Sequence, residues 1–93
     1  METIYKYSLR VGPLSHVPMP VGAKVLCAKT QGDCDICLWA IVDTAANYEY
    51  RCFCVIGTGE SIPRSDGTTL KFIDTVLLFG GKVVYHVFEV VSA

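Results

Sequence analysis

Two apolar runs in the last third of the chain flank a pair of glycines. The runs cover residues 72–79 and 82–91, and both are rich in valine, leucine and aromatic side chains. Between them lie Gly80 and Gly81. Paired glycines adopt the positive φ angles of a two-residue hairpin turn without steric strain. The pattern therefore predicts a β-hairpin with its turn at Gly80-Gly81 and with both strands well populated by residues that favour sheets.

Counting outward from this turn sets the register of the hairpin. It pairs Phe79 with Lys82, Leu77 with Val84, Thr75 with His86, and Ile73 with Phe88. Both faces are then mostly apolar, whereas a hairpin with one solvated face alternates apolar and polar residues. We expect cover on both sides, from the rest of the chain or from a second copy, and a homodimer is favoured. One face would carry Ile73, Leu77, Phe79, Val84 and Phe88, and the other Phe72, Val76, Leu78, Val83, Tyr85 and Val87.

Four further strands are predicted, at residues 4–11, 23–29, 36–42 and 48–56. The run 36–42 is almost continuously apolar and indicates a buried, central strand. Pro18 and Pro20 indicate a stiff connector, because proline cannot donate to a β-ladder. If 44–47 closes a hairpin, Cys37 lies opposite Cys54. No segment has the spacing of an amphipathic helix.

The chain is therefore predicted to be one all-β domain over residues 1–93. About six antiparallel strands would form a small sandwich or a rolled, barrel-like sheet.

Charge and composition change this picture in one respect. The net charge of −1 and the pI of about 6.0 leave no basic footprint for nucleic acid. Charged residues make up only 18% of the chain, below the usual quarter, which hints that association buries some surface. No apolar run is long enough to span a membrane, and no signal-peptide pattern is present. With an odd number of cysteines, five, we expect reduced thiols in the cytoplasm.

The cysteines invite a zinc-site interpretation. Structural zinc favours cysteine pairs in turns, whereas most of these cysteines enter or lie within predicted strands. Buried free cysteines commonly act as small hydrophobic residues, so we expect thiols without metal. The four thiolates considered are Cys34, Cys37, Cys52 and Cys54, with Cys27, His16 and His86 in reserve.

Candidate catalytic and phosphate-binding patterns are weak. A Cys–His–Asp set around His86 would need residues from distant strands to converge, and nothing in the chain requires it, so no enzyme and no cofactor is expected. The stretch from Gly57 to Glu60 lacks the lysine and the following helix of a phosphate loop. It is interpreted as a turn or bulge. Because loops often carry function, the candidate functional loop is Gly57, Thr58, Gly59 and Arg64.

Several short motifs occur together along nearly the whole chain. They are Ile4-Tyr-Lys-Tyr7, Met19-Pro-Val-Gly-Ala23, Leu38-Trp-Ala-Ile-Val-Asp43, Gly57-Thr-Gly59, and Gly80-Gly81 followed by His86-Val-Phe-Glu89. In this order they resemble an uncharacterised family of small single-domain proteins encoded by bacteriophages and prophages. The resemblance implies a viral or prophage origin and a setting in the host cytoplasm. It implies no reaction.

Three functional hypotheses follow. The first is a non-catalytic accessory protein that binds a host protein, for instance an inhibitor of a host defence system such as an anti-CRISPR protein. The second is a binder or sponge for a small ligand such as a signalling nucleotide, which would show basic residues around a pocket near Arg51, Arg64 or Lys71. The third is a minor structural protein of the virion.

Overall fold

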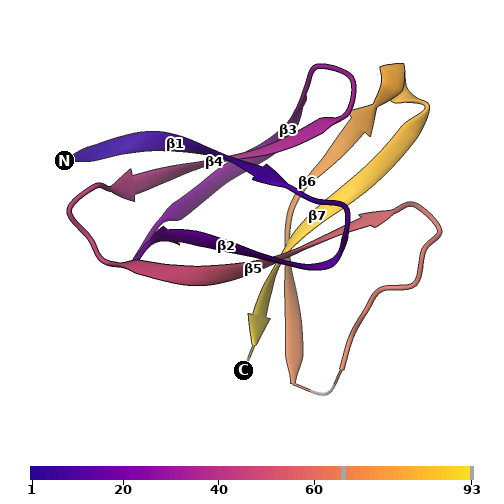
Figure 1. Ribbon diagram of the computed structural model, residues 1–93. Coiled ribbons are helices and arrows are strands. Elements are labelled where there is room, and N and C mark those ends of the chain that lie inside the picture. The colour runs from indigo at the N-terminus through magenta and orange to yellow at the C-terminus, as the bar shows by residue number, and fades with distance from the viewer. Residues whose placement is uncertain (66, 93) are drawn as a thin grey trace.

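Two antiparallel sheets stack face to face in the computed structural model, which describes residues 1–65 and 67–92. One sheet has three strands in the order β1-β4-β3, and the other has four in the order β2-β5-β7-β6 (Figure 1). The fold is therefore an all-β sandwich rather than one rolled sheet. The strands are β1 (Glu2–Leu9), β2 (Gly12–Pro20), β3 (Lys24–Gln31), β4 (Asp35–Asp43), β5 (Tyr48–Gly57), β6 (Thr68–Leu78) and β7 (Val83–Ser92).

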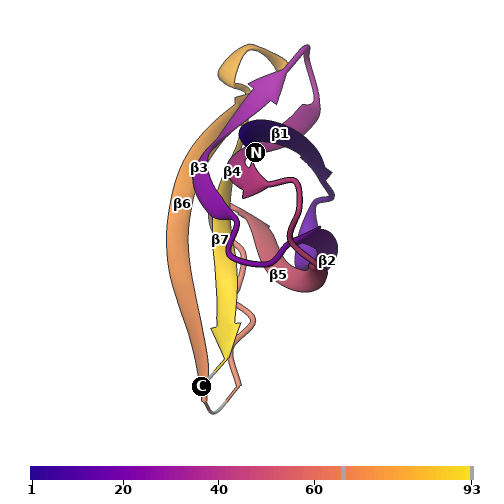
Figure 2. The same ribbon diagram turned by 90° about the vertical axis from the view of Figure 1, so that its left-hand side faces the viewer.

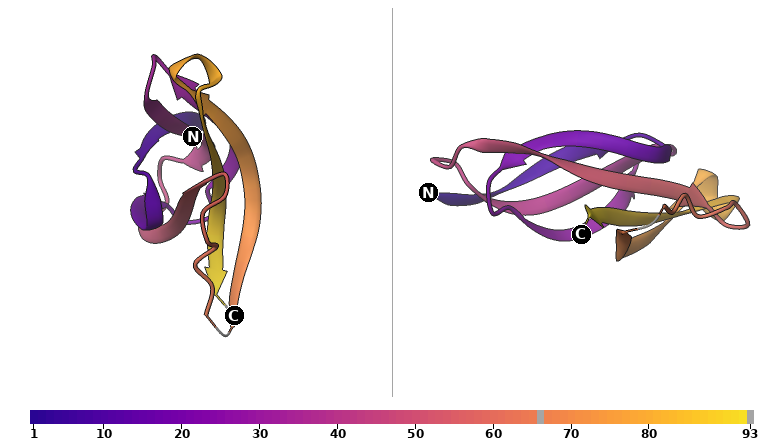
Figure 3. Two further views of the ribbon diagram at one scale, coloured as in Figure 1. Left: turned by 90° about the vertical axis from the view of Figure 1, so that its right-hand side faces the viewer. Right: turned by 90° about the horizontal axis from the view of Figure 1, so that it is seen from below.

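The hydrophobic core lies between the two sheets. Alternate residues of each strand face inward, and the largest of them, Phe53, is fully buried. Leu38 of β4 and Val87 of β7 are fully buried as well. The molecule measures only 15 Å along its shortest axis, and Figures 2 and 3 show the two layers from the side and from below.

The second strand corrects the sequence interpretation. The predicted connector around Pro18 and Pro20 is part of β2, which pairs with β5 alone and so lies at an edge of the four-stranded sheet. Two residues apart in a strand, the prolines direct their missing N–H groups to the same side. An edge strand tolerates this because its outward side has no partner to bond.

The hairpin considered between 36–42 and 48–56 does not form. β4 pairs with β1 and β3, whereas β5 pairs with β2 and β7, so the connection 44–47 carries the chain from one sheet to the other. Both strands bury an inward face, and they meet across the core instead of side by side. Cys37 therefore lies opposite Ser8, and Cys54 lies opposite Phe88. The prediction that β4 is a buried central strand is confirmed.

The last hairpin forms at one side of the four-stranded sheet, with β6 at the edge. The predicted pairing is confirmed from Leu78–Val83 to Asp74–Val87. A bulge at Ile73 then shifts the register, so Phe72 instead of Ile73 lies opposite Phe88. Because a bulge adds one residue to its strand, Ile73 packs against the core and Phe72 faces outward, 57% exposed.

The turn of this hairpin is longer than the two residues predicted. Gly80 (φ 68°, ψ 26°) and Gly81 (φ 89°) have the angles of a type I′ turn, and the Lys82 amide donates to the Phe79 carbonyl at 3.4 Å. The ladder, however, ends at Leu78 and Val83. Phe79 itself has a positive φ of 51°, and its amide donates to the Asp33 carbonyl at 2.9 Å. The turn is thereby tied to the β3–β4 connection.

Replacing Gly81 with valine is expected to lower the free energy of unfolding by about 1–2 kcal/mol. A β-carbon at this position would meet no atom within 4 Å, so the effect comes from backbone strain alone. Urea denaturation measures it, and Gly81→Asn is the control because asparagine tolerates positive φ. An unchanged unfolding midpoint for the valine variant would contradict the assignment of a type I′ turn.

Candidate functional site

The predicted functional loop forms a tight turn directly after β5. The Glu60 amide donates to the Gly57 carbonyl at 3.1 Å, and the Gly57 amide donates to the Glu60 carboxylate. The Thr58 amide donates to the carbonyl of Val84 at 3.2 Å, which fastens the turn to β7. Gly59 has a positive φ of 90°. These three amides are already bonded, two within the turn and one to β7, which supports the interpretation as a turn over that of a phosphate loop.

A hollow of about 240 Å³ lies beside this turn, on the outer face of the four-stranded sheet. His86 lines it, with Nε2 2.7 Å from Thr58 Oγ1 and Nδ1 3.0 Å from Thr75 Oγ1. A hydroxyl can donate or accept, so both ring nitrogens are satisfied in either tautomer. Asp74 accepts from the Ala28 amide at 3.3 Å instead. The two threonines therefore fix the imidazole without supplying the carboxylate partner of a catalytic set. The lining residues are Ile56, Gly57, Thr58, Gly59, Glu60, Ile62, His86 and Phe88, without Arg64.

The cysteines are dispersed through the sandwich. Cys37 and Cys54 are buried in different sheets, while Cys34 is exposed in the β3–β4 connection. Burial raises the pKa of the Cys54 thiol. Within residues 1–65 and 67–92, no three cysteine, histidine or acidic side chains gather closely enough to hold a metal ion. The expectation of metal-free thiols stays a prediction.

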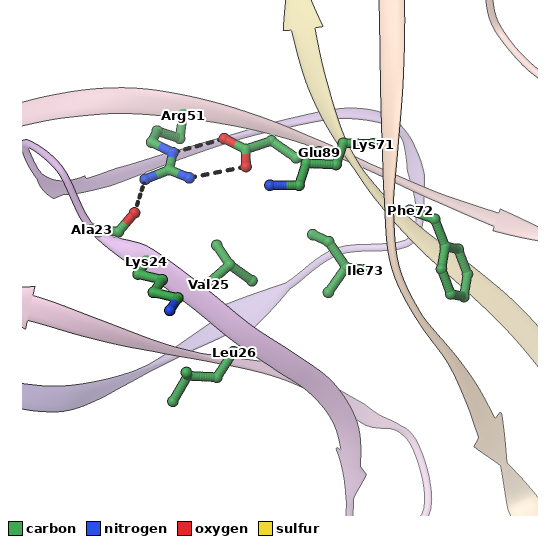
Figure 4. A pocket seen from close by; sticks show the side chains of 9 residues that line it. All are labelled: Ala23, Lys24, Val25, Leu26, Arg51, Lys71, Phe72, Ile73 and Glu89. Carbon is green, nitrogen blue, oxygen red and sulfur yellow. Dashed lines mark hydrogen bonds and ion pairs between the residues drawn. The ribbon is translucent and has the colours of Figure 1, made fainter.

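A second hollow, of about 320 Å³, opens where the two sheets meet at their edge strands β3 and β6 (Figure 4). It brings together Arg51 and Lys71, two basic residues that the sequence singled out separately, and adds Lys24. Figure 4 shows Lys71 extending over the hollow from β6, and Lys24 on the β3 side. Hereafter this is the seam hollow, lined by Ala23, Lys24, Val25, Leu26, Arg51, Lys71, Phe72, Ile73 and Glu89.

An ion pair forms the floor of the seam hollow. Arg51 Nε and Nη2 donate to the two carboxylate oxygens of Glu89 at 2.7 and 2.9 Å, and Nη1 donates to the Ala23 carbonyl. The side chains of Arg51 and Glu89 are only 18% and 13% exposed. The hydrogen bonds to Glu89 raise the pKa of Arg51, so the guanidinium stays charged. Strands β5 and β7 and the residue just before β3 are joined at this point.

The seam hollow is positively charged in a protein whose net charge is negative. Its three cations and one carboxylate sum to +2, against −1 for the whole chain. Glu89 is occupied by Arg51, and neither Lys24 nor Lys71 makes an ion pair with any of the described residues. The sequence named Arg51 and Lys71 as basic residues near a possible pocket, but it gave no reason to add Lys24, because the three cations come from three strands and converge only through the stacking of the sheets.

C-terminal to the residues that line the seam hollow, side-chain contacts join β3 to β6. The Thr30 hydroxyl donates to the Leu77 carbonyl at 2.5 Å, and Lys29 Nζ lies 3.0 Å from Asp74 Oδ2. The bonded residues are 45 to 47 positions apart, so the two strands run in the same direction. This offset places the bulge at Leu26 beside the bulge at Ile73. The β3–β6 side-chain contacts all lie C-terminal to the two bulges, and the seam hollow lies at the bulges and N-terminal to them.

The outer face of the β6–β7 hairpin is apolar and uncovered at its β6 side. Phe72 and Leu77 are 57% and 56% exposed, and the Phe72 ring contacts the edge of Phe88 with centroids 5.7 Å apart. No charged side chain lies among the residues that face outward from the ladder between Leu70 and Leu77. Hereafter the hairpin face comprises Leu70, Phe72, Thr75, Leu77, Val84, His86, Phe88 and Val90.

These features define the class of protein: a two-sheet β-sandwich with an apolar hairpin face and a basic seam hollow. The chain belongs to the family described as a domain of unknown function, DUF7352, which matches residues 1–93. This agrees with the expectation of an uncharacterised single-domain family. No match was found among curated proteins or solved structures. Across residues 1–65 and 67–92, no helix has the length and apolar character needed to cross a membrane.

Proposed function

We propose that this protein is a non-catalytic accessory protein that acts by binding another protein, and that it works as a homodimer joined through the hairpin face. The observation that carries the proposal is the exposure of Phe72 and Leu77 on a strand-rich apolar surface. Large exposed apolar patches on small domains mark interaction sites. The His86 site supplies a fixed imidazole without the partners of a nucleophile or an acid–base pair.

A second copy is the occupant that suits the hairpin face. In a two-fold symmetric interface the same patch meets itself, so any charge in the patch meets its own copy. The hairpin face holds no lysine, arginine, aspartate or glutamate, and nothing in it repels a second copy. The lysines of this hairpin lie elsewhere, Lys71 facing the seam hollow and Lys82 in the turn.

The origin and the partner come from the resemblance described above. The order of the motifs from Ile4 to Glu89 supports a phage or prophage gene product that acts in the host cytoplasm on a host protein. Within that setting we propose an inhibitor of a host defence system, comparable to an anti-CRISPR protein. A second candidate, a small-ligand binder, is favoured by one observation: Arg51 and Lys71 line the same basic hollow.

Light scattering at low micromolar concentration tests the dimer. The wild-type protein is expected to show twice the mass of the 10.2 kDa chain, and Leu77→Glu is expected to show the single-chain mass. Tyr50→Glu is the matched control, because Tyr50 is an exposed apolar residue outside the hairpin face. It should remain dimeric. A wild-type mass near 10.2 kDa would overturn the dimer.

Binding to a host protein is tested by affinity capture from bacterial lysate, followed by reconstitution from purified components. We expect a captured protein to form a complex of fixed stoichiometry with the purified dimer. Failure of every captured protein to rebind in purified form would contradict the protein-binding function, whatever the oligomeric state.

A further inference from the structure

We infer that the free edge of β6, together with the seam hollow, binds an extended peptide segment in which acidic and apolar residues alternate. The segment would add a strand to β6 at residues 68–72. This inference rests on the proposed protein-binding function and names the chemistry of the partner's segment.

The edge of β6 is unpaired in the part that the peptide would use. β6 pairs with β7 on one side only, and among the described residues no backbone hydrogen bond joins it to β3. Figures 1 and 2 show the first half of β6 extending past β3, with no strand along its outer side. Such an edge presents a row of free N–H and C=O groups, which an extended peptide can bond.

The side chains of β6 set the sequence of the segment. Lys71 lies opposite Glu89 in the ladder and faces the seam hollow, whereas Phe72 lies opposite Phe88 and faces outward. Residues of an added strand would stand beside these two in turn, because cross-strand neighbours share a face. An acidic residue would enter the seam hollow beside Lys71, and an apolar residue would pack on Phe72. Acidic and apolar residues are therefore expected to alternate along the bound peptide.

The seam hollow has the charge and size to receive the acidic side chains. Lys71 extends over it from β6, Lys24 lies on its β3 side, and the carboxylate of Glu89 is already bonded to Arg51. Its volume of about 320 Å³ leaves room for more than one side chain. The opposed bulges at Leu26 and Ile73 keep β3 and β6 from closing over it.

A second copy of β6 is a poorer occupant of the same edge. In a symmetric antiparallel pairing of two β6 strands, the sheet faces are preserved, and both Lys71 side chains lie on one face of the joined sheet. Like charges on adjacent strands destabilise such a pairing. The edge of β6 therefore suits the peptide better than a second copy of β6. It adjoins the hairpin face at Phe72, which both surfaces use.

Fluorescence polarisation with a labelled synthetic octapeptide of alternating glutamate and valine tests the inference. We expect saturable binding to the wild-type protein, and a loss of at least about tenfold in affinity for Lys24→Glu/Lys71→Glu. The matched control is Lys6→Glu/Lys82→Glu, which changes the net charge equally at lysines outside the seam hollow. It should bind within about twofold of wild type. Circular dichroism verifies that both double variants fold.

Hydrogen exchange supplies the backbone readout. The peptide is expected to slow exchange of the amides in residues 69–72 that point away from β7, and to leave β1 unchanged, because a strand added to β6 would bond only those amides. Absence of peptide binding, equal loss in the two double variants, or no protection in β6 would each overturn the inference. So would tighter binding of inorganic pyrophosphate that displaces the peptide, since the occupant would then be a small anion. The light-scattering and reconstitution results stand apart from all of these outcomes.

Discussion

Leucine in place of Glu89 is expected to lower the free energy of unfolding by about 3 kcal/mol. The substitution leaves the Arg51 guanidinium largely buried with only the Ala23 carbonyl as a partner. An unpaired buried charge is strongly destabilising, because no nearby group replaces the hydration that it lost on folding. Urea denaturation of the variant measures the loss.

The double variant Arg51→Met/Glu89→Leu distinguishes the effect of an unpaired charge from the effect of lost packing. Removing both charges leaves no uncompensated group, and apolar replacements of a buried pair are commonly neutral or stabilising. We expect the double variant to lie within about 1 kcal/mol of wild type. If the double variant were as unstable as Glu89→Leu alone, the destabilisation would come from packing instead of from the orphaned charge.

Phe53→Ala is expected to reduce the free energy of unfolding by about 3–5 kcal/mol. Phe53 has no exposed surface, and it lies on the inward face of β5 within the hydrophobic core. The truncation removes a ring from a core packed between two sheets, so the neighbours cannot close the cavity completely. Thermal and urea unfolding of the purified variant provide the measurement.

The control for this prediction is Tyr50→Ala on the same strand. Tyr50 is 74% exposed on the opposite face of β5, so its removal should change stability by less than about 0.5 kcal/mol. Similar losses for the two variants would show that β5 does not separate an inner from an outer face in solution.

Local patterns predicted the local parts of this fold. The glycine pair fixed the hairpin from Asp74 to Val87, and the apolar run of β4 identified the central strand of its sheet. The predictions that failed concern which strands, distant in sequence, lie next to one another. Pro18 and Pro20 fit a strand once that strand lies at an edge, and the sequence does not state which strands become edges. Likewise, an inward apolar face does not tell whether β4 and β5 stand side by side or across the core.

For the candidate sites too, local features could be predicted from the sequence and long-range ones could not. The turn at Gly57-Thr-Gly59 was predicted from its glycines. The seam hollow could not be predicted, because Lys24, Arg51 and Lys71 lie on three different strands. The bulge at Ile73 was also missed, and that single extra residue decides that Phe72 faces solvent.

The strand order also sets a sequence of events for folding. Among the described strands, only the pairs β3–β4 and β6–β7 are consecutive in the chain, whereas β1 pairs with β4 and β2 pairs with β5, both of which come later in the sequence. Hairpins close within microseconds, but pairings between distant strands must first overcome the entropy of closing long loops. We therefore expect the two hairpins to form early and the N-terminal strands to dock last. Until β1 and β2 arrive, the inner edges of β4 and β5 stay open to pairing with other chains.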